Sequence, residues 1–238
     1  MKTVLITGGS RGIGRAMVEA FSKKGYVVAF TYKNSAEEAE RLSSEIGAVA
    51  IRADSASESD VNSAVKNVIE KLGRVDCLVN NAGVSSFSLF TDLSLEDWNN
   101  TLAVNLTGAF LYSKAVIPDM LKRKEGRIIN VSSMWGLVGS SCEVHYSTAK
   151  AGLIGMTKAL AKELGPSGIT VNAIAPGVIN TDMNKNISSE DMEALKEDTP
   201  MMRIGEGADV ATAALFLASE EASFITGDVL NVSGGFVI

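Results

Sequence analysis

Short runs of β-branched and apolar residues alternate along the chain with longer segments of helical period, and this alternation constrains the fold strongly. Strands that alternate with helices are typical of βαβ units, in which the strands run parallel. The runs Val4–Ile6 and Cys77–Val79 are apolar without a break, which indicates a sheet that is covered on both faces. The pattern therefore predicts an α/β fold: a doubly wound parallel sheet of about seven strands with helices on both faces.

The same pattern gives approximate bounds for these elements. Strands are expected at residues 3–7, 27–31, 48–53, 75–80, 127–131, 169–173 and 229–232. Helices are expected at residues 12–24, 36–46, 58–71, 95–123, 146–164 and 207–218. No low-complexity linker divides the chain, so we expect residues 1–238 to form a single domain.

The composition excludes several classes of protein. Hydrophobic residues make up 46% of the 238 residues, which is enough for a full-sized core. No stretch approaches eighteen consecutive apolar residues and no signal peptide is evident, so we expect neither a membrane span nor export. The net charge of -6 argues against nucleic acid as a partner. Cys77 and Cys142 are too few for a disulfide framework, which favours a reducing cytoplasm, and no metal site is expected.

Residues 181–205 interrupt the alternation of strands and helices. The segment is polar, yet it carries methionines at positions 183, 192, 201 and 202. Methionines could fill gaps in the core, so an irregular surface insertion is one interpretation. Long loops that follow the carboxyl end of a strand are often functional, and we favour a mobile lid over a hydrophobic substrate pocket.

A glycine-rich loop, Thr7–Gly14, lies between the first predicted strand and the first predicted helix. Glycines permit a tight turn and a close approach of the backbone, while a helix N-terminus offers free N–H groups and positive partial charge. The spacing is Gly-x-x-x-Gly-x-Gly rather than Gly-x-Gly-x-x-Gly. Because the loop opens a βαβ unit, it predicts a site for a dinucleotide pyrophosphate in a Rossmann-type fold.

The end of the second predicted strand bears on the choice of dinucleotide. An acid at this place would bind the adenosine ribose 2′-hydroxyl of NAD, but the strand ends in Tyr32-Lys33-Asn34 without a carboxylate. Lys33 and Arg11 could instead neutralise a 2′-phosphate, although a lysine at a strand end could also be merely solvated. This pattern of charge predicts NADP(H) rather than NAD(H).

Tyr146 and Lys150 stand four residues apart in a segment of helical period, so their side chains project from one face, one turn apart. A free phenol titrates near ~10, which is too high for ready proton exchange at neutral pH. A nearby ammonium favours the phenolate and lowers that pKa. The pair therefore indicates an acid–base centre, although a solvated lysine beside a half-buried tyrosine has the same spacing.

Several motifs resemble, in their order and spacing, those of the short-chain dehydrogenase/reductase family, and the resemblance covers essentially the whole chain. The motifs are Thr7–Gly14, Asn80-Asn81-Ala82-Gly83, Asn105, Ser133, Tyr146-x-x-x-Lys150 and Pro176-Gly177. Each motif is weak alone. Ser133, however, follows a predicted strand and precedes Tyr146 by thirteen residues, as in that family. The combination is highly specific.

The resemblance implies catalytic roles for four residues. Tyr146 would be the general acid that protonates the carbonyl oxygen, and Lys150 would lower its pKa and hydrogen-bond the nicotinamide ribose. Ser133 would hold and polarise the substrate carbonyl, and Asn105 would support a water relay behind the lysine. Donors aimed at that oxygen stabilise the alkoxide charge that develops during reduction. A strand-end cap for Ser133 and a backbone tie for Asn105 are the structural alternatives.

The resemblance also implies which residues contact the cofactor. Asp54 would meet the adenine amino group, and the segment that starts at Pro176 would lie against the nicotinamide. The full set would be Gly8, Ser10, Arg11, Gly12, Ile13, Gly14, Lys33, Asp54, Ser55, Asn81, Ala82, Gly83, Tyr146, Lys150, Pro176, Gly177, Ile179 and Thr181. The family has no catalytic role for the position of His145, so a packed or exposed histidine is expected there.

Within that family, the sequence from Ile225 to Gly235 most resembles bacterial 3-oxoacyl-[acyl-carrier-protein] reductases. This resemblance implies an NADPH-dependent reduction of 3-oxoacyl thioesters on acyl carrier protein. It also implies a homotetramer that forms through residues 95–123, 146–164 and the C-terminal strand. Lys122, Arg123 and Lys124 could form a basic patch for the acidic carrier, or simply a solvated helix end.

Other substrates stay open. Residues 132–136 and 141–144 resemble reductases that act on a ketone-bearing modified lysine of elongation factor P, where Glu143 would attract the amine of the substrate. Glu143 could equally face solvent, and the fold also allows a small ketone, a sugar or a steroid. A non-catalytic NADP-binding module is a further alternative, but Ser133, Tyr146 and Lys150 are all present.

Overall fold

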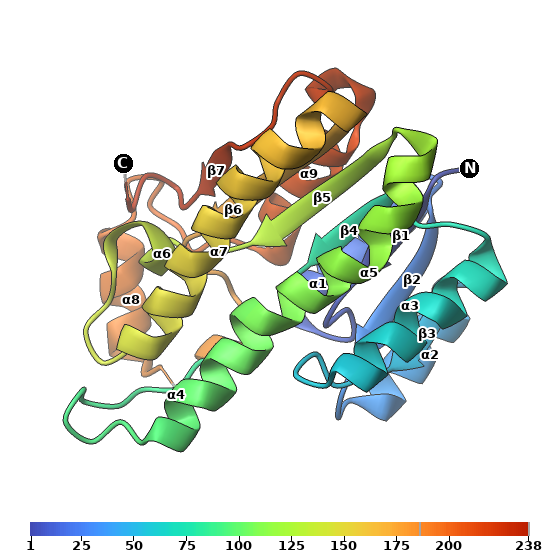
Figure 1. Cartoon of the computed structure of the whole chain (residues 1–238). Helices are drawn as coiled ribbons and strands as arrows, with labels where there is room; N and C mark the ends of the chain where they lie inside the picture. Colours follow the sequence, from blue (N-terminus) through green and yellow to red (C-terminus); the bar gives the residue numbers. More distant parts are fainter. Residues whose placement is uncertain (186, 238) are drawn as a thin grey trace.

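The chain folds around one parallel β-sheet with helices on both faces (Figure 1). The computed structural model describes residues 1–185 and 187–237. Its strands are β1 (Thr3–Ile6), β2 (Val27–Tyr32), β3 (Val49–Arg52), β4 (Cys77–Asn80), β5 (Gly126–Val131), β6 (Ile169–Pro176) and β7 (Val229–Val232). Its helices are α1 (Gly12–Lys23), α2 (Ala36–Ile46), α3 (Glu58–Leu72), α4 (Leu95–Leu102), α5 (Gly108–Arg123), α6 (Trp135–Val138), α7 (Val144–Leu164), α8 (Ser189–Glu197) and α9 (Gly207–Ala218). The predicted doubly wound α/β fold is confirmed.

The order of strands in the sheet places the candidate site. The order is β3-β2-β1-β4-β5-β6-β7, so the chain builds outward from β1 to one edge and then returns to add β4 on the other side of β1. Leu5 pairs with Ala29 on β2 and with Leu78 on β4. Because all the strands are parallel, their carboxyl ends share one edge of the sheet. A crevice is expected at that edge, where the strand order reverses between β1 and β4.

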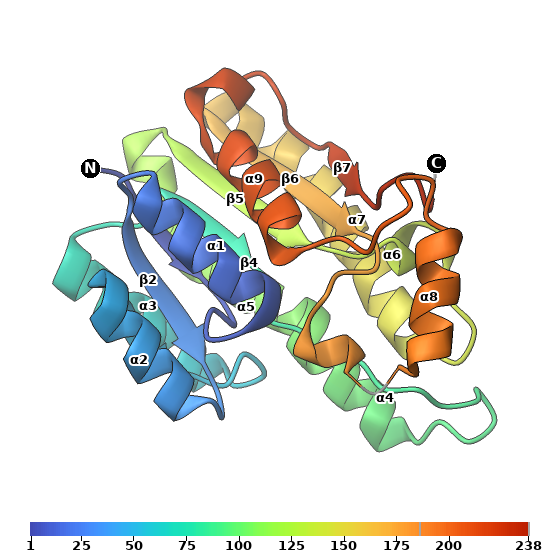
Figure 2. The same ribbon diagram turned by 180° about the vertical axis from the view of Figure 1, so that it is seen from behind.

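Each face of the sheet has its own hydrophobic core, because successive side chains of a strand point to opposite faces. Strand β1 contributes Val4 and Ile6 to one core, with Phe21 of α1 and Leu42 of α2. It contributes Leu5 to the other core, together with residues of α3, α5 and α7. Figure 2 shows α1, α2 and α9 on the first face, whereas α3, α5 and α7 lie on the second face in Figure 1. Because the helices cover the two faces of the sheet, the loops that connect strands to helices lie at the carboxyl ends of the strands.

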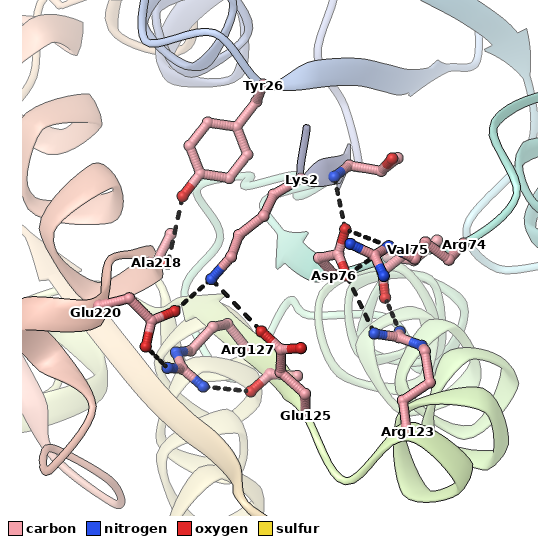
Figure 3. Close-up of polar contacts among 12 residues, drawn as sticks. Lys2, Tyr26, Arg74, Val75, Asp76, Arg123, Glu125, Arg127, Ala218 and Glu220 are labelled. Carbon is pink, nitrogen blue, oxygen red and sulfur yellow. Dashed lines mark hydrogen bonds and ion pairs between the residues drawn. The ribbon is translucent and has the colours of Figure 1, made fainter.

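A cluster of charged residues fastens the opposite edge of the sheet, at the amino ends of the strands (Figure 3). Asp76 is only 4% exposed, and it accepts hydrogen bonds from the Thr3 N–H at 2.8 Å and from Arg123 at 3.0 Å. Lys2 and the buried Arg127 both pair with Glu220. A buried carboxylate with several donors is compensated for its loss of solvent.

The expected basic patch at residues 122–124 therefore lies at this edge, away from the carboxyl ends of the strands. Its central residue, Arg123, is committed to Asp76, Asp119 and the Val75 carbonyl. Lys122 and Lys124 are exposed, so only the central arginine of the patch belongs to the charged cluster.

The helix predicted over residues 95–123 is wrong in one respect. A π-helical turn, Ala103–Thr107, separates α4 from α5. Asn105 lies in this turn, and its side-chain Nδ2 donates to the Thr101 carbonyl at 2.9 Å. A side chain that competes for a backbone carbonyl in this way disturbs regular α-helix, and π-turns often mark functional positions. The other predicted bounds differ from the observed ones by at most three residues, and α6 was not predicted.

The segment predicted as a lid contains more regular structure than expected. It holds helix α8, which begins after Ser188, whose hydroxyl accepts the Asp191 N–H at 3.0 Å. Three of its methionines, Met183, Met201 and Met202, are more than half exposed, so these three do not fill the core. Residue 186 of the predicted lid lies outside the described residues.

Candidate active site

The N-terminus of α1 differs from those of α3, α4 and α8. Helices α3, α4 and α8 each begin after a serine whose hydroxyl accepts a backbone N–H, and each has acids in its first turn. Helix α1 begins after Arg11, whose side chain makes no capping bond, and its first turn has no acid. Its first N–H groups and positive partial charge therefore stay available to an anion.

Two positions of the predicted phosphate loop, Gly8 and Gly14, require glycine. Gly8 has a φ of +66°, which glycine adopts readily. A Cβ at Gly14 would lie only 2.1 Å from the Gly8 carbonyl oxygen, so the loop closes tightly on the start of α1. The remaining predicted loop residues, Ser10, Gly12 and Ile13, lie between these two glycines. This tight turn is the backbone geometry that the predicted pyrophosphate site requires.

Hydrogen bonds join this loop to the loop that follows β4, across the point where the strand order reverses. Thr7 Oγ1 accepts the N–H groups of Asn81 and Ala82, each at 2.9 Å. In return, Asn81 Nδ2 donates to the carbonyl oxygens of Thr7 at 2.9 Å and Gly8 at 3.1 Å. The Asn81 side chain is therefore used to hold the phosphate loop in place.

At the predicted adenosine end, Lys33 and Asp54 form an ion pair with their charged atoms 2.6 Å apart. Burial acts to raise the pKa of Asp54, but the Lys33 ammonium and the Ala56 N–H outweigh it and lower the pKa overall. Arg52 Nε donates to the Lys33 carbonyl at 3.3 Å, which brings a further cation to this end of the sheet. The sequence pattern did not single out Arg52, because its position beside Lys33 depends on the pairing of β2 with β3.

Ser133, Tyr146 and Lys150 come together from two adjoining elements. Ser133 follows β5, and Tyr146 and Lys150 lie on the first turns of α7, which packs against the sheet over β6. Lys150 Nζ donates to the Val131 carbonyl at 2.8 Å and lies 5.6 Å from the centre of the Tyr146 ring. Ser133 Oγ accepts the Trp135 N–H at 3.1 Å, which leaves its own hydroxyl proton free to donate.

The electrostatics of this group differ from the prediction in one respect. Burial raises the pKa of Tyr146 to about 12; the Ser133 hydroxyl opposes the rise and the Glu143 carboxylate adds to it. Burial also lowers the pKa of Lys150 to about 8. The net effect on the pKa of Tyr146 is therefore a rise, whereas the sequence predicted that Lys150 would lower it; desolvation of the buried phenol is the largest cause.

The Asn105 side chain holds the backbone of Val84, next to this site. Its Nδ2 donates to the Val84 carbonyl at 2.9 Å, and its Oδ1 accepts the Val84 N–H at 3.2 Å. Gly83 lies between Asn105 and Lys150: a Cβ there would be 2.6 Å from Asn105 Oδ1 and 3.4 Å from Lys150 Nζ. The side-chain amide thus ties backbone, as the structural alternative for Asn105 proposed, at a place that borders Lys150.

Glu143 and His145 lie just before Tyr146 in the sequence, and both are buried, with 5% and 0% of their surface exposed. Glu143 accepts a hydrogen bond from Ser85, and His145 Nε2 pairs with Ser86 at 2.9 Å. The interpretation of Glu143 as a solvent-facing residue is therefore wrong, and His145 is packed. Sequence reasoning missed Ser85 and Ser86, because two serines in a loop carry no signal of their own.

The predicted nicotinamide segment begins where β6 ends, at Pro176. A Cβ at the next residue, Gly177, would lie 2.7 Å from the Ser233 Cα, so this glycine permits close packing. Ile179 forms a β-bridge with Gly205, which pins together the two ends of the lid segment. A cavity of about 600 Å³ lies between Gly12 and lid residues that include Asn184 and Met192. Thr181 also lines this cavity, so the lid segment and the phosphate loop both border it.

Within residues 1–185 and 187–237, no group of three or more His, Cys, Asp or Glu side chains is arranged to hold a metal ion. No helix in the described part of the chain is long and apolar enough to cross a membrane.

Comparisons with known proteins agree with this geometry. Residues 8–237 match the model of a family described as enoyl-(acyl carrier protein) reductase. The chain is 44% identical to the 3-oxoacyl-[acyl-carrier-protein] reductase FabG of Aquifex aeolicus, over 98% of this chain and 96% of that protein. It is 42% identical to the 3-oxoacyl-[acyl-carrier-protein] reductase of Synechocystis, over 100% of this chain and 97% of that protein. The FabG reductase of Staphylococcus epidermidis is 40% identical over 98% of each chain. The chain therefore belongs to the short-chain dehydrogenase/reductase family of nicotinamide-dependent oxidoreductases.

Proposed function

We propose that this protein is an NADPH-dependent 3-oxoacyl-[acyl-carrier-protein] reductase, which converts 3-oxoacyl thioesters to 3-hydroxyacyl thioesters. One observation carries the proposal: Ser133, Tyr146 and Lys150 are buried together at the carboxyl edge of the sheet. Full-length relatives that are 40% to 44% identical bear the name of this reductase, which supports the choice of substrate.

The chemistry assigns a task to each of these side chains. The nicotinamide, when bound, supplies hydride to the carbonyl carbon. Ser133 donates a hydrogen bond to the carbonyl oxygen, and Tyr146 then gives that oxygen its proton. The phenol is protonated at neutral pH, as a proton donor must be, and the alkoxide that develops on the substrate is basic enough to take its proton. Lys150 would place its ammonium beside the phenol and hold the nicotinamide ribose. Asn105, whose side chain is bonded to the Val84 and Thr101 backbone, would support a water relay behind the lysine.

A panel of substrates tests this proposal. NADPH oxidation should proceed with acetoacetyl thioester and should fall by about 10²- to 10⁴-fold in Tyr146→Phe, the usual effect of removing a general acid. Tyr26→Phe is a matched control, because within the described part of the chain the Tyr26 hydroxyl bonds only the Ala218 carbonyl, at the far edge. Unchanged turnover in Tyr146→Phe would remove it as the acid. Reduction of crotonyl thioester instead of acetoacetyl thioester would favour the enoyl reaction in the family description.

The same panel separates the remaining substrates. Exclusive activity on ketone-bearing elongation factor P, or on a small ketone, a sugar or a steroid, would overturn the thioester proposal. Binding of NADPH without turnover on any of them would indicate a non-catalytic module. No contact of the buried Glu143 favours an amine substrate, since its carboxylate is already bonded to Ser85.

For the cofactor, we propose NADP(H) rather than NAD(H). Arg11 is exposed beside the phosphate loop, and Lys33 and Arg52 add two cations at the adenosine end. Asp54 partly neutralises Lys33, so a 2′-phosphate would have to share the lysine with it or displace it. Isothermal titration with NADPH and NADH tests this preference, and tighter binding of NADH than of NADPH would contradict it.

The remaining parts of the proposal concern the whole chain. Residues 1–238 act as one dinucleotide-binding and catalytic domain, and residues 181–205 close over the substrate. The pinned ends of this segment at Ile179 and Gly205 support a lid that moves as a unit. We also propose a cytoplasmic homotetramer that binds neither nucleic acid nor membrane, which size-exclusion chromatography with light scattering would test.

A further inference from the structure

Three hydrogen bonds fasten the loop that follows β4 to the short segment just before Tyr146. We name them together the clasp. They join Ser85 to Glu143, Ser86 to His145 at 2.9 Å, and the Ser88 N–H to the Cys142 carbonyl at 2.9 Å. Two of the three therefore connect a loop serine to a polar side chain within three residues of the proposed acid.

The two polar side chains of the clasp are buried without taking part in the proposed proton transfer. A buried carboxylate and a buried imidazole destabilise a protein unless hydrogen bonds compensate them. For Glu143 the compensating donor is Ser85, and for His145 the partner is Ser86. His145 Nδ1 has no further partner among the described residues. Glu143 and His145 therefore both bind the loop that follows β4.

The loop carries apolar side chains that the protein core does not use. Phe87 is 72% exposed although both of its neighbours, Ser86 and Ser88, are fastened by the clasp. Leu89 and Phe90 follow and are also mostly exposed. Several large apolar side chains in one loop beside an active site are typical of a binding surface.

We propose that Glu143 and His145 are positioning residues: through the clasp they hold this apolar loop beside Tyr146, where it receives the hydrocarbon tail of the substrate. The proposal rests on the proposed function for the nature of the substrate. According to this proposal, the clasp affects how well the protein binds substrates with long tails, and it does not affect the reduction of the carbonyl.

The first test is structural and needs no substrate. Chymotrypsin cleaves after Phe and Leu, so its rate of cleavage within residues 87–90 reports how firmly the loop is held. In Ser85→Ala/Ser86→Ala this rate should rise about tenfold, as expected for the loss of hydrogen bonds to a charged and a polar group. Ser88→Ala is the matched control, because its hydroxyl bonds only the neighbouring Leu89 carbonyl and the clasp uses its N–H.

The second test separates positioning from catalysis. KM for 3-oxododecanoyl thioester should rise about tenfold in the double variant, while KM for acetoacetyl thioester and kcat for both stay within about twofold. Glu143→Gln keeps an acceptor for Ser85 and should preserve the wild-type cleavage rate. Glu143→Ala removes the Ser85 bond alone, so its cleavage rate should lie between those of the wild type and the double variant.

The proposal is overturned if the double variant matches Ser88→Ala in its cleavage rate, or if KM rises equally for both thioesters. If neither thioester is reduced by the wild-type protein, the proposed function fails. The cleavage rates still decide whether the clasp holds the loop.

Discussion

Replacement of Lys150 by methionine should make the folded protein more stable while it abolishes reduction. Lys150 is 3% exposed, and its ammonium donates to the Val131 carbonyl but to no other acceptor among the described residues. Methionine has a similar length without the charge, so it fills the same space. The variant therefore isolates the free-energy cost of burying this cation.

The magnitude follows from the pKa of Lys150, which burial lowers from 10.5 to about 8. Below pH 8 both the folded and the unfolded chain carry the ammonium, so the folded state bears the whole cost, about 3 kcal/mol. Between pH 8 and 10.5 only the unfolded chain binds the proton, so stability rises with pH. The variant also loses the hydrogen bond to the Val131 carbonyl, which lowers its stability by about 1–2 kcal/mol. Lys150→Met should thus be about 1–2 kcal/mol more stable at neutral pH.

Urea unfolding followed by tryptophan fluorescence, at one protein concentration, measures this difference. At pH 7 the midpoint for Lys150→Met should exceed that of the wild type, and at pH 9.5 the gap should shrink by about 2 kcal/mol. Lys158→Met is the control on the same helix: Lys158 is exposed, and its replacement should change stability by no more than about 0.5 kcal/mol at either pH. A Lys150→Met protein that is less stable at pH 7, or a gap that does not shrink, would refute the reasoning.

Three further substitutions test the supports of the site. Gly83→Ala places a Cβ 2.6 Å from Asn105 Oδ1, so it should lower stability by about 1–3 kcal/mol and reduce turnover; wild-type values in urea unfolding and NADPH oxidation would contradict this. Thr7→Val removes the acceptor of two N–H groups and should weaken NADPH binding in a fluorescence titration, whereas Thr7→Ser should retain it. Asp76→Asn lies at the far edge and should destabilise by about 3 kcal/mol. Its KM should stay at the wild-type value, and a changed KM would link that edge to the site.

Much of the fold was predictable because its signals are local. The alternation of apolar runs with helical segments predicted the parallel sheet, and most bounds were correct within three residues. The break near Asn105 was not predictable, since it depends on a side chain that turns back to the Thr101 and Val84 backbone. Nor was α8 expected, because a polar segment with scattered methionines has no clear helical period.

The order of its motifs along the sequence determined what kind of protein this is. A glycine loop after the first strand, and Ser133, Tyr146 and Lys150 at fixed spacings, depend only on neighbours in the chain and on the parallel sheet that aligns their ends. The tertiary structure alone decided the properties that depend on surroundings. Burial raised the pKa of Tyr146 where the nearby lysine predicted a fall, and it enclosed Glu143 against a serine 58 residues away in sequence. Solvent exclusion and long-range partners set these properties, and neither can be read from local sequence.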